Sequence, residues 1–107
     1  MNLKQWAQRL EIEEDELLEI VDLFIKTSFS DLAKLQAAIE EKDILPVVKA
    51  AHSIKGAAGI LGLLEIHEAA KRIETAARTN RLEEIEADLR IIKEKLEMIT
   101  DALKKGS

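Results

Sequence analysis

The stretch LEEIEADLRIIKEKLEMITDAL, residues 82–103, decides the fold class. Its apolar residues recur three and four positions apart, a spacing that places their side chains on one face of an α-helix. These residues are Leu82, Ile85, Leu89, Ile92, Leu96, Ile99 and Leu103. Charged residues fill most of the other positions, as on a helix with one face against a core and the other in water. The pattern predicts a helix over about 82–104 that forms a seam of a helical bundle.

The rest of the chain has the same helical periodicity, and no segment shows the strict alternation of a half-buried strand. Further helices are predicted over about residues 3–10, 13–41, 44–61 and 64–79. Asp43 is a candidate N-cap for the third of these, Pro46 falls in its first turn, and Gly62 is a natural stop. Because short loops force neighbouring helices to be antiparallel, we expect an all-α protein: an antiparallel up-down four-helix bundle with a short additional N-terminal helix.

Composition narrows the classes of protein. A length of 107 residues suits a single domain, which we expect to span residues 1–107. The absence of cysteine excludes disulfides and thiolate metal sites and favours a reducing compartment, so a cytoplasmic location is expected. A net charge of −5 argues against a nucleic-acid binder, which needs a basic face. Uninterrupted apolar runs are short, so no membrane-spanning segment is expected.

A second stretch, AAHSIKGAAGILG at residues 50–62, carries the chemistry. A glycine inside a helix costs about 1 kcal/mol relative to alanine, so glycines here need a reason. His52, Lys55, Gly56 and Gly59 lie at helical spacings of three and four, which places them on one stripe beside the apolar one. Gly56 leaves room for another protein to reach the imidazole of His52. Lys55 adds a positive charge that attracts phosphoryl oxygens.

The same helix lacks the groups that activate a phosphoryl group. It has no glycine-rich phosphate cradle and no cluster of acids that could hold magnesium. An imidazole is largely neutral and nucleophilic at pH 7. We therefore expect a site that can hold a phosphoryl group but cannot activate one unaided.

These residues resemble the signature of histidine-containing phosphotransfer (HPt) domains, which is H-x-x-K-G followed by another glycine at the helix end. The resemblance covers essentially the whole chain. It implies that His52 accepts a phosphoryl group at Nε2 from an aspartyl phosphate of a response-regulator receiver domain and passes it to the aspartate of another receiver. Lys55 and Gly56 match the neighbours of the histidine in that family, with implied roles in charge support and access.

The resemblance also implies the partners. Receiver domains are the expected partners, and a hybrid sensor histidine kinase is a further candidate. Magnesium and its acidic ligands would belong to the receiver, so we expect no cofactor, no metal site and no autonomous kinase activity in this chain. The apolar faces of the helices can pack against one another within one chain, so a monomer is expected.

Three further residues are candidate partner contacts: Gly59, Glu74 and Arg78. Close helix packing is the alternative role for Gly59. HPt domains often place a polar group from the following helix near the imidazole, and Glu74 and Arg78 are the candidates, on an expected outward stripe with His67 and Lys71. Some family members carry glutamine at the place of Glu74, which leaves its hydrogen bonding open. His67 is expected to be a surface residue.

Two other functions stay open at this point. The chain could be the P1-type phosphoacceptor domain of a chemotaxis-type histidine kinase, which receives its phosphate from an attached ATP-binding domain. It could also be a non-catalytic helical adaptor in which the histidine is incidental.

Overall fold

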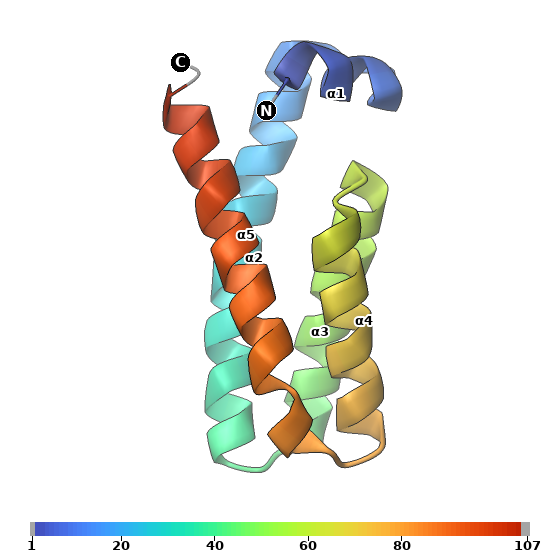
Figure 1. The fold of residues 1–107 in the computed structure, drawn as a ribbon, viewed down its shortest axis with the longest axis vertical. Helices are drawn as coiled ribbons and strands as arrows, with labels where there is room; N and C mark the ends of the chain where they lie inside the picture. The colour runs from blue at the N-terminus through green and yellow to red at the C-terminus, as the bar shows by residue number, and fades with distance from the viewer. Residues whose placement is uncertain (1, 106–107) are drawn as a thin grey trace.

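The computed structural model describes residues 2–105, and all of the regular structure in that range is helical (Figure 1). The elements are α1 (Leu3–Leu10), α2 (Glu14–Glu40), α3 (Ile44–Leu61), α4 (Leu64–Arg78), the 3-10 turn η1 (Leu82–Glu84) and α5 (Glu86–Lys105). The all-α prediction is therefore confirmed. The predicted helix over 82–104 differs from the structure at its start, because η1 and Ile85 precede α5.

The ends of α3 follow from local sequence. Gly62 has a left-handed backbone with φ of +74°, the conformation that glycine adopts without strain, and it ends the helix as predicted. The N–H of Leu63 then donates to the carbonyl of Ala58 at 2.9 Å, which satisfies one carbonyl of the last turn. Asp43 occupies the N-cap position, but its side chain makes no capping hydrogen bond, so the predicted cap is positional only.

The four long helices pack around one core. Helix α3 packs against α2 and α4, and α5 packs against α4 and α2. Figure 1 shows the α2–α3 and α4–α5 connections at one end of the molecule and the α3–α4 connection at the other. Completely buried large side chains from α2 to α5 fill the centre: Leu17, Val21, Leu35, Val47, Ile54, Ile66, Ile73, Ile85, Ile92 and Leu96. Burying such side chains supplies most of the stability of a small bundle.

Helix α1 crosses the end of the bundle at which α3 stops (Figure 1). The buried indole N–H of Trp6 donates to the backbone carbonyl of Leu61 at 2.7 Å. This carbonyl belongs to the last turn of α3 and has no partner within its own helix. Trp6 therefore fixes the end of the helix that carries His52.

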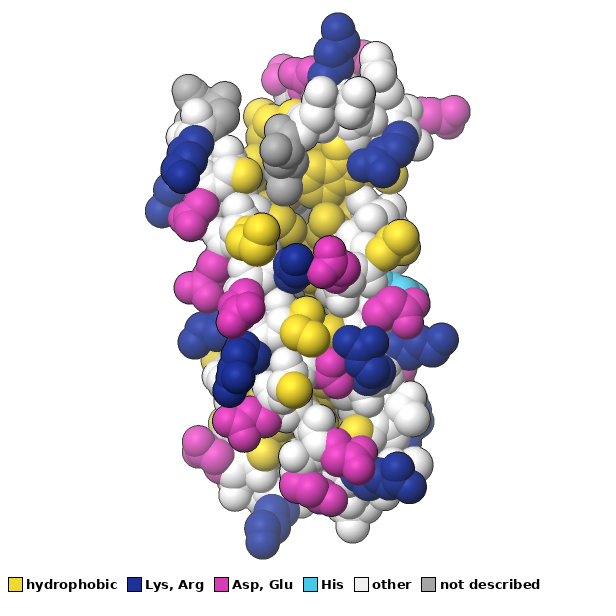
Figure 2. Space-filling view, viewed as in Figure 1, with side chains coloured by type: hydrophobic (Ala, Val, Ile, Leu, Met, Phe, Trp, Pro, Cys, Tyr) yellow, Lys and Arg dark blue, Asp and Glu magenta, His cyan; other side chains and the backbone are white. Residues whose placement is uncertain are grey.

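One helix meets the length and composition of a membrane span. Helix α3 is long and apolar enough to cross a membrane on those two criteria alone, which does not contradict the expectation that the chain has no membrane-spanning segment. A helix can meet these criteria without a long uninterrupted apolar run, and α3 does so because it has few charges over its 18 residues. A buried core helix passes the same test, and α3 places Val47, Ala51, Ile54 and Ala58 in the core. On the face shown in Figure 2, acidic and basic side chains are interspersed.

Candidate functional site

His52 lies on the exposed face of α3, with 66% of its side chain accessible. Gly56 is one turn further along the helix, and a Cβ atom added to it would meet no atom within 4 Å. The approach to the imidazole over Gly56 is therefore open. Helical geometry dictates this arrangement, since residues four apart lie one above the other on one face.

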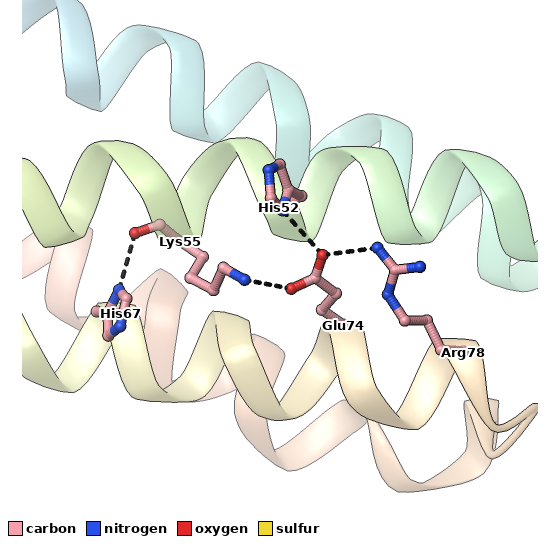
Figure 3. Close-up of polar contacts among 5 residues, drawn as sticks. All are labelled: His52, Lys55, His67, Glu74 and Arg78. Carbon is pink, nitrogen blue, oxygen red and sulfur yellow. Dashed lines mark hydrogen bonds and ion pairs between the residues drawn. The ribbon is translucent and has the colours of Figure 1, made fainter.

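Glu74 of α4 is the centre of a polar cluster that includes His52 (Figure 3). Its Oε2 atom lies 2.9 Å from Nδ1 of His52 and accepts a 3.1 Å hydrogen bond from Nη2 of Arg78. Its Oε1 atom accepts a hydrogen bond from Nζ of Lys55 at 2.6 Å. The cluster joins α3 to α4, because His52 and Lys55 lie on one helix and Glu74 and Arg78 on the other.

These contacts keep Glu74 ionised. The hydrogen bond from Lys55, together with those from Arg78 and His52 and the charge of Lys55, lowers the pKa of Glu74 from 4.5 to about 2, although burial acts in the opposite direction. An ionised carboxylate can only accept hydrogen bonds, so Nδ1 of His52 must be the donor. In the neutral ring the proton then sits on Nδ1, and Nε2 keeps its lone pair. Figure 3 shows this second ring nitrogen pointing away from Glu74.

The cluster has an excess of positive charge beside the imidazole. Lys55 and Arg78 each carry one positive charge, and Glu74 carries one negative charge. The side chain of Lys55 is about three-quarters covered, and the side chain of Arg78 is mostly exposed. An anionic group at Nε2 of His52 would meet a net favourable potential here.

The burial of Glu74 corrects the expectation that it lies on an outward stripe of α4. Only 6% of the residue is accessible. Ala70 and Ala77, which are also buried, stand four residues before it and three residues after it. This spacing continues the apolar stripe through position 74 and was the available signal. Arg78 is exposed, as predicted, and its guanidinium contacts the carboxylate of Glu74.

His67 is also not the plain surface residue that was expected. It is half-buried, and its Nδ1 atom lies 2.9 Å from the backbone carbonyl oxygen of Lys55 (Figure 3). Gly59 leaves room for this approach, because a Cβ atom added there would stand 3.1 Å from Nδ1 of His67, closer than ordinary van der Waals contact. Close helix packing, one of the two roles predicted for Gly59, is therefore what the structure supports.

An apolar groove lies between α2 and α3 on the other side of His52. Its volume is about 250 Å³, and Ile20, Leu23, Ser53, Ala57 and Ile60 are among its lining residues. Ile60 and Leu23 are 78% and 66% accessible, which is high for large apolar side chains. On α3, His52 and Gly56 lie between this groove and the side of the helix that meets Glu74.

Comparison with known proteins identifies the family. Residues 19–105, which run from early α2 to the end of α5, match the family model of the Hpt domain. The chain belongs to the Hpt domain family. The fold is also similar to the crystal structure of histidine-containing phosphotransfer protein B (HptB) from Pseudomonas aeruginosa PAO1. The TM-score is 0.82 at 26% identity, over 94% of this chain and 88% of HptB. A search among curated proteins gave no match.

This Hpt domain is a phosphorelay intermediate. Hpt domains work in two-component phosphorelays with response regulators and are generally soluble. The family match and the likeness to a phosphotransfer protein do not favour the two other functions that the sequence left open, a P1-type kinase domain and a non-catalytic adaptor.

Proposed function

We propose that His52 is the phosphoacceptor of this phosphorelay domain and that Nε2 is its nucleophilic atom. The observation that carries the proposal is the hydrogen bond between Nδ1 of His52 and the carboxylate of Glu74. This bond places the ring proton on Nδ1 and leaves the lone pair on Nε2, the nitrogen on the accessible side. Lys55 and Gly56 support the reaction through charge and access, respectively.

The transfer step follows from this protonation state. The Nε2 lone pair attacks the phosphorus of an aspartyl phosphate on a receiver domain, and the bond between phosphorus and the carboxylate oxygen breaks. The aspartate leaves as a carboxylate with the bonding electrons, so no proton needs to move. The phosphorylated ring keeps Nδ1–H and carries a positive charge, which the carboxylate of Glu74 stabilises. Transfer to a second receiver is the reverse of this step.

The groove between α2 and α3 is the proposed docking surface for the receivers. Leu23 and Ile60 are exposed apolar residues of this groove, and the groove adjoins the side of α3 that carries His52 and Gly56. A receiver that packs on this groove would reach the imidazole over Gly56. The receiver would supply the magnesium ion and the acidic residues that activate the phosphoryl group, as receivers do in this family. Arg78 and Gly59 are also proposed as secondary partner contacts, because both are exposed; for Gly59 this role would come in addition to the room that it leaves for His67.

Phosphoryl labelling tests the proposal. Incubation with a phosphorylated receiver domain and magnesium should label the chain at an acid-labile, alkali-stable position, and His52→Gln should abolish the label. His67→Gln removes the other histidine of the chain, and this variant should still acquire the label when the reaction is run to completion, whatever its rate. Label that persists in His52→Gln would overturn the site assignment. ATP alone should give no label.

Topology, oligomeric state, location and a further partner complete the proposal. The long helices form an antiparallel up-down four-helix bundle, which is supported by their alternating connections and by the closed ring of packed neighbours. The chain over residues 1–107 is a single domain that acts as a monomer in the cytoplasm, without nucleic-acid or membrane binding. The net charge of −5 supports the expectation about nucleic acid, and the absence of cysteine supports the expected location. A hybrid sensor histidine kinase is a candidate source of one receiver.

A further inference from the structure

His67 makes a contact that the proposed reaction does not use directly. The Lys55 carbonyl oxygen can only accept a hydrogen bond, so Nδ1 of His67 carries the proton and donates to it across 2.9 Å. The bond links α4 to the backbone of α3 at the residue whose side chain holds Glu74. Lys55 therefore connects His67 to the cluster around His52: its backbone contacts His67 and its side chain contacts Glu74.

The contact depends on a glycine. Within an α-helix the carbonyl of Lys55 already accepts the N–H of Gly59, so a second donor must come in from the side on the remaining lone pair. The imidazole can do so because no side chain stands at position 59, where a Cβ atom would be 3.1 Å from Nδ1. The conformational freedom that glycine brings is not needed at Gly59, which lies within the helix. The missing side chain is what matters.

Small side chains are frequent on the buried faces of α3 and α4. Alanines supply half of the buried side chains on these two helices. Small side chains interlock less than large ones, so a helix can shift along its neighbour at a smaller loss of packing. Directional hydrogen bonds are more demanding, because they weaken steeply when distance or angle changes. His67 and Glu74, seven residues apart on α4, supply such bonds to the same stretch of α3.

We propose that His67 is a positioning residue for phosphoryl transfer: its hydrogen bond to the Lys55 carbonyl holds α3 and α4 in the register in which Glu74 reaches Nδ1 of His52. The inference rests on the proposed role of His52 as the phosphoacceptor. Gly59 supports this hydrogen bond, since it leaves room for the ring of His67.

The test compares three variants by two independent measurements. The ¹⁵N chemical shifts of the His52 ring report which nitrogen carries the proton, and transfer from a phosphorylated receiver reports the rate. His67→Ala removes the donor, and Gly59→Ala crowds it. His67→Asn is the conservative variant, because its side-chain amide N–H stands at the place of Nδ1. Lys71→Ala, an exposed position one turn along α4, is the matched control.

In the wild type and in Lys71→Ala, His52 should carry its proton on Nδ1. In His67→Ala and Gly59→Ala the two tautomers should mix and transfer should slow by about tenfold, because small misplacements at a reacting centre have large effects on rate. His67→Asn should restore most of the Nδ1–H tautomer of His52 and most of the transfer rate. If His67→Ala lowers thermal stability but leaves the His52 spectrum and the transfer rate unchanged, the positioning role is wrong. The spectrum decides this even if labelling of His52→Gln were to overturn the phosphoacceptor assignment.

Discussion

The Nδ1 atom of His52 lies 2.9 Å from Oε2 of Glu74, although the two residues are 22 positions apart and belong to different helices. The position of the proton on the His52 ring is therefore set by a residue of α4 and not by α3, the helix that carries His52. A solvent-exposed imidazole on an isolated helix would exchange its proton between both nitrogens. Here a buried, ionised carboxylate selects one of them.

Removing Glu74 should affect both stability and the state of the ring. Glu74→Ala should lower the free energy of unfolding by about 2 kcal/mol, because hydrogen bonds to a buried charged group are lost. It should also mix the His52 tautomers. Glu65→Ala is the matched control on the same helix as Glu74, since it breaks a solvent-exposed ion pair with Lys95 of α5 and should change stability by less than about 1 kcal/mol. Urea denaturation measures the free energy of unfolding of both variants. Equal losses in the two variants would contradict the role given to Glu74.

The lowered pKa of Glu74 predicts a pH dependence of stability. A carboxyl group with a lower pKa in the folded state stabilises the protein above its unfolded pKa, and this contribution is lost as pH falls through the folded pKa. The contribution is therefore lost between about pH 4.5 and about pH 2, and this difference in pKa corresponds to about 3 kcal/mol of unfolding free energy. The stability difference between the wild type and Glu74→Gln should shrink from pH 6 to pH 2.5. A difference that stays constant over this range would show that the carboxylate is not stabilised as described.

The sequence identified the stripe of α3 but not the group that completes the site. His52, Lys55 and Gly56 lie within five residues, so helical geometry alone places them together. Glu74 requires knowledge of how α4 packs on α3, and charged residues are almost never fully buried without partners, so solvent was its default location. His67 was missed for the same reason, since its acceptor is a backbone carbonyl that carries no sequence signal.

Gly56 should prove replaceable for folding but not for function. Nothing lies within 4 Å of an added Cβ atom, and alanine is the better helix former, so Gly56→Ala should raise the free energy of unfolding by about 0.5–1 kcal/mol. Gly56→Leu should also fold, because the position faces solvent, but its longer side chain should slow transfer by obstructing the imidazole. Chemical denaturation and a transfer assay on both variants measure these effects. Wild-type transfer by Gly56→Leu would show that this glycine does not provide access.

The fold was more predictable than the site because its signals are local. Helix α3 begins and ends where the sequence predicts, with Gly62 in the left-handed conformation that stops it. The exception is the start of the last helix, where η1 occupies Leu82–Glu84. Apolar periodicity continues through that turn, since both helix types bring residues three apart onto one side, so periodicity could not separate them.

The groove between α2 and α3 should determine receiver binding. Ile60→Glu places a charge in the most exposed apolar position of this groove and should weaken transfer from a receiver by about tenfold or more, because apolar anchors at the centre of an interface carry much of the binding energy. The free energy of unfolding should change little, since the side chain is 78% accessible. Met98→Glu is the matched control: Met98 is also an exposed apolar residue, at 60%, but it lies against the start of α4 on α5. Transfer rates measured as a function of receiver concentration should show a raised KM for Ile60→Glu alone. An equal loss in both variants would indicate that negative charge anywhere on the surface weakens docking, and an unchanged KM for Ile60→Glu would place the receiver on another face.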